Sequence, residues 1–150
     1  MKIIKIIVLK SDIINMIGQD TDYAGTKTET ADRNAFHQRV ATTESDAVLL
    51  ARYWQDACAS LADLLRSFIT DIQFGRETLS MTLEVSEAYD DSLTPAVESG
   101  VSAVLAAGIT SRWFRFTLHD RADEWEKEAS RRFGLLLANL YHRKKPQRKQ

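Results

Sequence analysis

The chain has 150 residues, 44% of them hydrophobic and 27% charged, with a net charge of −1, which is typical of one ordinary globular domain. This excludes a wholly disordered chain and a collagen-like repeat, and the single Cys58 excludes a disulfide scaffold. No long uninterrupted apolar stretch is present, so we expect a soluble protein with no membrane-spanning segment.

The chain begins with a predicted strand and a short helix. Residues 3–9 are mostly β-branched and are interrupted by Lys5, which favours a buried strand over a signal peptide. Residues 11–18 follow as a short helix that Gly18 should end. Residues 19–42 then become polar and rich in threonine, which predicts a long loop.

Three longer helices follow, of which two are amphipathic and one is largely apolar. Residues 43–46 (TESD) form a capping-box pattern before an apolar stripe on a helix of roughly 25 residues. A helix that opens at Thr94-Pro95 is apolar around much of its circumference, which predicts a central, buried position. Residues 121–142 form the last helix, acidic in its first turns and basic later, an order that complements the helix dipole.

The periodicity of these helices predicts which side chains form the core. Apolar residues recur at steps of three and four, so they share one face of each helix. The expected core residues are Leu50, Trp54, Leu61, Leu65, Phe68, Val101, Leu105, Trp125, Phe133 and Leu137.

A small sheet completes the predicted fold. Residues 80–86 alternate polar and apolar, the pattern of a half-buried strand, and a third strand comes either from residues 70–78 or from the threonine-rich loop. The fold class is therefore α+β and mainly helical, with three helices packed against a small β-sheet. We expect one globular domain over residues 1–143 and a disordered basic tail over residues 144–150.

The sequence contains no motif that calls for catalysis. The histidines His37, His119 and His142 have no metal-ligand spacing, and no glycine-rich phosphate loop is present. Cys58 lies beside alanines on an apolar helix, which favours a small buried hydrophobe over a nucleophile. Asp90 and Asp91 precede a helix, where adjacent aspartates are usually caps and turn formers. We therefore predict no catalytic, cofactor-binding or metal-binding residue, and no enzyme.

Two basic features are candidate partner-binding sites. Residues 1–128 carry 13 basic and 21 acidic side chains, whereas residues 129–150 carry seven basic side chains and no acidic one. Arg112 and Arg115 alternate with aromatic residues, a pattern that either stacks nucleic-acid bases or marks an ordinary helix end with a buried aromatic core. The candidate partner-binding residues are Arg143, Lys144, Lys145, Arg148, Lys149, Arg112 and Arg115.

Several segments resemble small uncharacterised proteins that phages and prophages of Bacteroidetes encode. They are residues 39–43 (RVATT), 83–86 (LEVS), 89–95 (YDDSLTP), 112–117 (RWFRFT) and 140–146 (LYHRKKP). The resemblance implies a virion or assembly protein of the head–tail junction, present in the bacterial host cytoplasm and incorporated into the particle. It supplies no functional site that can be transferred to these residues.

Two functions therefore stay open. The first is a head–tail connector (neck) subunit, which contacts other virion proteins and copies of itself through two complementary surfaces. The second is a nucleic-acid-binding or packaging accessory, which holds phosphates through its basic tail.

Overall fold

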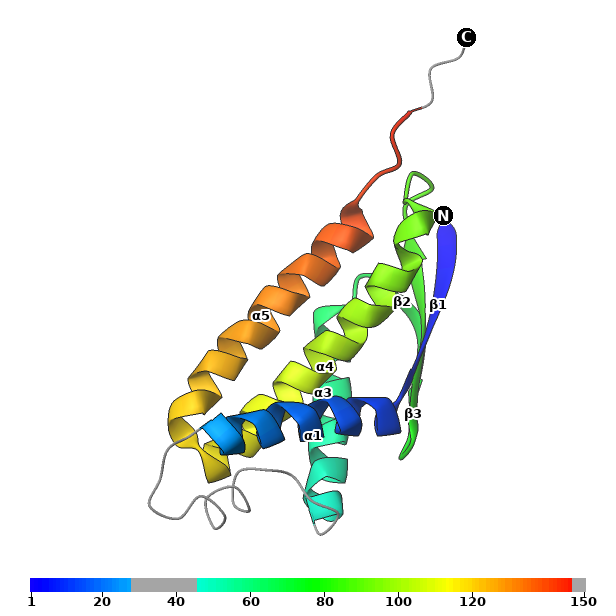
Figure 1. Cartoon of the computed structure of the whole chain (residues 1–150). Coiled ribbons are helices and arrows are strands. Elements are labelled where there is room, and N and C mark those ends of the chain that lie inside the picture. Colours follow the sequence, from blue (N-terminus) through cyan, green and yellow to red (C-terminus); the bar gives the residue numbers. More distant parts are fainter. Residues whose placement is uncertain (28–45, 147–150) are drawn as a thin grey trace.

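A computed structural model describes residues 1–27 and 46–146 and shows an α+β fold that is mainly helical (Figure 1). The expected fold class is thus confirmed, but the described residues form four α-helices, so the prediction of three is wrong. The elements are β1 (Lys2–Leu9), α1 (Lys10–Lys27), α3 (Ala47–Leu64), β2 (Ile69–Phe74), β3 (Thr78–Val85), the 3-10 turn η2 (Asp91–Leu93), α4 (Thr94–Thr117) and α5 (His119–Tyr141).

The sheet is antiparallel, with strand order β1-β3-β2. β1 pairs with β3 without a register shift, from Lys2 opposite Val85 to Leu9 opposite Thr78. The even-numbered side chains Ile4, Ile6 and Val8 are buried, as the two-residue period of a strand requires. The third strand is β2, which confirms the first of the two alternatives, a strand from residues 70–78. The alternative, a strand in the threonine-rich segment, falls mostly on residues 28–42, which lie outside the described residues.

α4 is the central helix, as its apolar composition predicts. It packs against α1, α3, α5 and β1, and Val97, Val101 and Ile109 are completely buried on it. The segment Asp91–Thr117 is long and apolar enough to span a membrane by length and composition, and 44% of its apolar window is buried inside the fold. The core helix of a soluble protein meets the same criterion.

Two predicted helix boundaries are wrong. α1 continues through Gly18 to Lys27, because burial of Ile13 and Ile17 in the core outweighs the roughly 1 kcal/mol that one glycine costs in a helix. α3 ends at Leu64, before Phe68, because a turn beginning at Leu65 redirects the chain into β2. Residues 43–45 of the predicted capping box lie outside the described residues.

The buried face of α5 also differs from the expected one. Trp125, Phe133 and Leu137 are only partly buried, and α5 instead buries Ala122, Leu136 and Leu140. α5 packs mainly on α4, and part of its wide apolar stripe stays open. The other expected core residues, Leu50, Trp54, Leu61, Leu65, Phe68, Val101 and Leu105, are buried as predicted.

Candidate functional site

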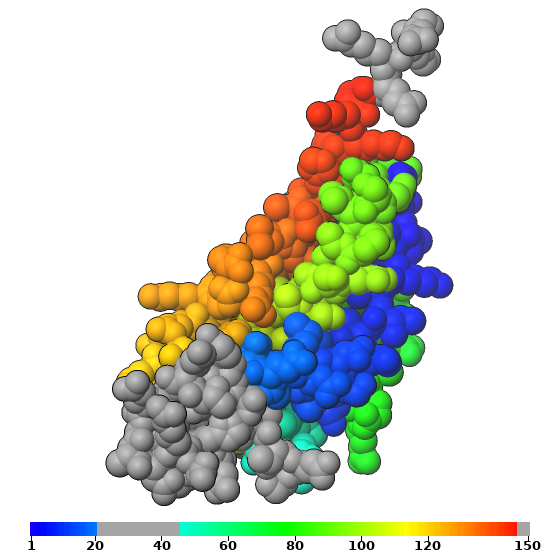
Figure 2. Space-filling model, viewed as in Figure 1, coloured from blue at the N-terminus to red at the C-terminus, as the bar shows by residue number. Residues whose placement is uncertain are grey.

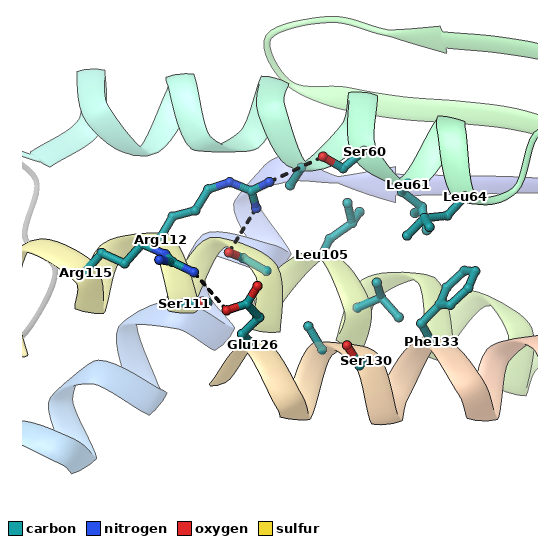
Figure 3. A pocket seen from close by; sticks show the side chains of 14 residues that line it. Ser60, Leu61, Leu64, Leu105, Ser111, Arg112, Arg115, Glu126, Ser130 and Phe133 are labelled. Atoms are coloured by element: carbon teal, nitrogen blue, oxygen red, sulfur yellow. Dashed lines mark hydrogen bonds and ion pairs between the residues drawn. The ribbon is translucent and has the colours of Figure 1, made fainter. Parts of the chain in front are cut away.

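A groove lies between α3 and α5, with α4 as its floor (Figure 3). Both outer helices pack on α4, and the space between them holds a cavity of about 430 Å³. Leu61 and Leu64 of α3 face Phe133 of α5 across Leu105 of the floor. Leu64 is 55% exposed, so this part of the groove presents an apolar side chain to solvent.

Arg112 lies at the polar end of the same groove. Its Nη1 donates a hydrogen bond to the Gly108 carbonyl oxygen at 3.0 Å, and its Nη2 reaches the Ser60 hydroxyl at 3.4 Å. The guanidinium therefore bridges α4 and α3 at the rim of the groove (Figure 3).

Arg115 and Glu126 form an ion pair across the turn between α4 and α5. The Nη2 of Arg115 lies 2.9 Å from Oε2 of Glu126, and the two side chains are 48% and 61% exposed. An ion pair this exposed adds little stability and opens at little cost. The polar end thus holds two guanidinium groups and one carboxylate, which leaves it positively charged.

The aromatic residues around these arginines are mostly core residues. Trp113 is 5% exposed and Phe114 is fully buried, whereas Phe116 is 77% exposed. Trp113 and Phe114 consequently have no free ring face on which a base can stack. For these two rings the structure supports the ordinary helix-end interpretation.

The start of the basic tail lies against the turn after β3. The N–H of Lys144 donates to the Ala88 carbonyl oxygen at 2.7 Å, and Arg143 forms a bridge with Tyr89. Hydrogen bonds from Ser92 lower the pKa of the Asp90 carboxyl, and the nearby charges of His142 and Lys144 lower it further. The described start of the tail therefore lies near one carboxylate of its own chain, that of Asp90.

The structure separates the candidate partner-binding residues into two places. Arg112 and Arg115 lie beside Glu126 near the start of α5, and Arg143, Lys144 and Lys145 follow its end. Glu126 and His142 are 16 residue steps apart along the helix, which corresponds to about 24 Å. Figure 2 shows the start of α5 in yellow and the residues after it in red at opposite ends of the molecule. Arg148 and Lys149 lie outside the described residues.

The environment of Cys58 disfavours a role as a nucleophile. Burial raises the pKa of the Cys58 thiol to about 12, so the thiolate is scarce at neutral pH. Residues 1–27 and 46–146 contain no cluster of three potential metal ligands. His119 and His142 are exposed, and His37 lies outside these ranges.

Sequence reasoning missed several groove residues. Ser60, Leu64, Glu126 and Ser130 line the cavity, but none was selected from the sequence. No sequence signal separated Leu64 from the core, because Leu61, Leu64 and Leu65 are three and four residues apart and therefore share one helix face. Comparisons with protein-family models, with curated proteins and with solved structures found no match.

Proposed function

We propose that this chain is a non-enzymatic structural or assembly protein of a phage or prophage, a head–tail connector (neck) subunit that acts through protein–protein contacts. The observation that carries the proposal is the groove between α3 and α5, in which open apolar walls meet a positively charged end. Its proposed occupant is an amphipathic helix of another virion protein.

The shape and chemistry of the groove favour a helix. A floor made by one helix and walls made by two others resemble the grooves that receive amphipathic helices elsewhere. Leu64 and Phe133 offer apolar contacts, and Arg112 with Arg115 favours an acidic residue at the matching end of the incoming helix.

A second copy of this chain is a poorer occupant. On its described helices the exposed large apolar residues stand singly, as Val48, Leu64, Phe116, Leu135 and Tyr141. Isolated exposed side chains do not form the continuous apolar stripe that a groove-binding helix needs.

The experiment compares two leucines with matched exposure. Leu64 in the groove is 55% exposed and Leu135 on the outer side of α5 is 54% exposed. A parent particle lacking the gene is complemented with the wild type, Leu64→Lys or Leu135→Lys, and the chain is quantified in purified particles. We expect Leu64→Lys to lose incorporation at least about tenfold, and Leu135→Lys to incorporate normally, with both variants folded by circular dichroism.

The outcomes separate the two parts of the proposal. If the wild-type chain is absent from particles and assembly intermediates, the structural function is wrong. If the wild type and Leu64→Lys incorporate equally, the groove is not the contact surface.

The second candidate function is nucleic-acid binding or packaging through the basic tail. The exposed side chains of Arg143, Lys144 and Lys145 favour it, whereas the nearby carboxylate of Asp90 weakens the positive field. A mobility-shift assay at two salt concentrations tests it: steeply salt-dependent binding that disappears without the tail supports this function.

A further inference from the structure

β1 is an edge strand whose outer side is open. β3 pairs with it on one side, and the sheet ends there in the described chain. The N–H of Lys10 donates to the Glu77 carbonyl oxygen at 2.8 Å, which identifies the even-numbered residues as those that bond to β3. Because antiparallel strands alternate bonded and non-bonded pairs, the odd-numbered residues direct their N–H and C=O groups to the open edge.

The same odd-numbered residues also expose their side chains. Ile3 is 62% exposed, Ile7 66% and Leu9 45%, and Lys5 is the one charge among them. β1 therefore presents free backbone groups and an apolar side-chain row together. Lysine, proline and bulges commonly prevent edge strands from pairing, and of these the exposed row of β1 has only the one lysine, Lys5.

The other edge of the sheet is shorter and less regular, and it carries polar side chains. β2 is two residues shorter than β1, has a register shift between Ile69 and Asp71, and carries exposed Asp71 and Gln73. On the central strand, Thr78 and Ser80 continue the polar surface. On the sheet face that carries Ser80, the exposed apolar side chains belong to β1, whereas the exposed Phe74 of β2 lies opposite the buried Leu79 on the other face. A strand added at the edge of β1 pairs with its free backbone groups and places its own side chains beside this apolar row.

We infer that β1 is a self-association strand that pairs antiparallel with β1 of a second copy, joining the two sheets across a two-fold axis. A two-fold pair presents the same surface twice, so the strand must be complementary to itself. A shift of one residue would place buried side chains on the exposed face, so only registers that pair odd-numbered residues with one another are allowed.

Charge and the overlap of the apolar row together select among the allowed registers. Centring the pair on Lys5 places the two Lys5 side chains directly opposite each other, which is unfavourable. Centring the pair on Ile6 instead places Lys5 opposite Ile7 and Ile3 opposite Leu9 of the second copy. In this register the apolar side chains of the row pack against one another. This register also brings Lys2 opposite Lys10, where the charge of Lys2 is compensated by Asp91 at 2.9 Å.

Sedimentation velocity of the full chain over a wide concentration range tests this inference. We expect a reversible monomer–dimer equilibrium, in which Ile7→Lys weakens association at least about tenfold by placing a lysine opposite Lys5. Gln73→Lys is the matched control, because Gln73 and Ile7 both lie opposite Ser80 on β3 but at opposite edges of the sheet. This control should leave the association unchanged.

Two substitutions at Lys5 keep the test valid if Ile7→Lys disturbs folding. Lys5→Thr removes the remaining repulsion and should tighten the dimer roughly twofold to fivefold. Lys5→Glu should pair preferentially with the wild type in a mixture, because opposite charges then lie diagonally across the interface.

A wild-type chain that stays monomeric up to about 1 mM, or equal weakening by Ile7→Lys and Gln73→Lys, would overturn the inference. It does not depend on the groove between α3 and α5.

Discussion

Cys58 shows how the position of one residue determines its chemistry. The side chain is fully buried on α3, and burial raises the pKa of the thiol to about 12. We predict that Ellman's reagent labels the native protein only through opening of the structure, at least about 100-fold more slowly than the chain unfolded in urea. Rapid stoichiometric labelling of the native protein would contradict this burial.

Leu61 and Leu137 were both expected in the core, but they have different environments. Leu61 is 2% exposed and Leu137 is only partly buried. Leu61→Ala should therefore destabilise the protein by about 2–5 kcal/mol, and Leu137→Ala by only about 1–2 kcal/mol, in urea unfolding followed by circular dichroism. Equal losses of unfolding free energy for the two variants would mean that Leu137 is buried in solution, for example in an interface with another molecule.

The two candidate arginines of the groove illustrate what residue patterns can predict. Arg112 and Arg115 were selected because they alternate with aromatic residues, and both line the groove. The pattern could not reveal Glu126 as the partner of Arg115, because that contact depends on how α5 folds back along α4. It also suggested stacking, whereas Trp113 and Phe114 are used by the core.

At the scale of elements, two glycines on the α4–α5 hairpin have opposite roles. A methyl group added at Gly100 would lie 3.3 Å from Cδ1 of the buried Leu136, whereas one added at Gly134 would meet no atom within 4 Å. Gly134→Ala should stabilise the protein by about 0.8–1.0 kcal/mol through helix propensity. In thermal unfolding, this corresponds to a rise in the midpoint of about 2–4 °C for a chain of this size.

Gly100→Ala is the matched comparison within the same hairpin. It gains the same helix propensity, but the close approach of Leu136 adds an overpacking cost of about 1–3 kcal/mol. We expect a net loss of up to about 2 kcal/mol in the same thermal unfolding experiment. A gain equal to that of Gly134→Ala would show that α5 can move away from α4 without cost.

Secondary structure was predictable where periodicity was strong and short-range. The spans of β1, β3 and α4 follow the predicted patterns to within a few residues, since each has a clear two-residue or helical period. The extent of α1 was not predictable, because Gly18 and the polar residues after it look like a helix end until Ile13 and Ile17 are seen to be buried in the core. The rotation of α5 was missed for a related reason: its leucines are adjacent, and only packing selects Leu136 over Leu137.

At the scale of the whole molecule, the fold redistributes the charge asymmetry. Arg131 and Arg132 both bind Glu128, whose pKa these hydrogen bonds lower to about 2. The charge asymmetry along the sequence lies between residues 1–128 and residues 129–150. That division assigns Glu128 and its two arginine partners to different parts, although they form one ion-pair network. Of the basic residues after residue 128, those left for a partner therefore begin at Arg143. The described ones lie near Asp90.

The contribution of the tail to assembly is tested by removing only what lies beyond its anchored start. Because the Lys144 N–H is bonded to Ala88, we choose deletion of residues 145–150, which keeps that hydrogen bond. We expect an unchanged thermal midpoint and reduced incorporation into particles, since steering by charge affects association more than folding.

A variant with glutamine in place of Lys145, Arg148 and Lys149 separates the effect of the tail's charge from the effect of its length. If charge steers assembly, it should behave like the deletion, with a defect that is largest at low salt, where charges on the wild-type tail are least screened. Normal incorporation of both variants would assign the tail no role in assembly and would leave the contacts to the groove and to β1.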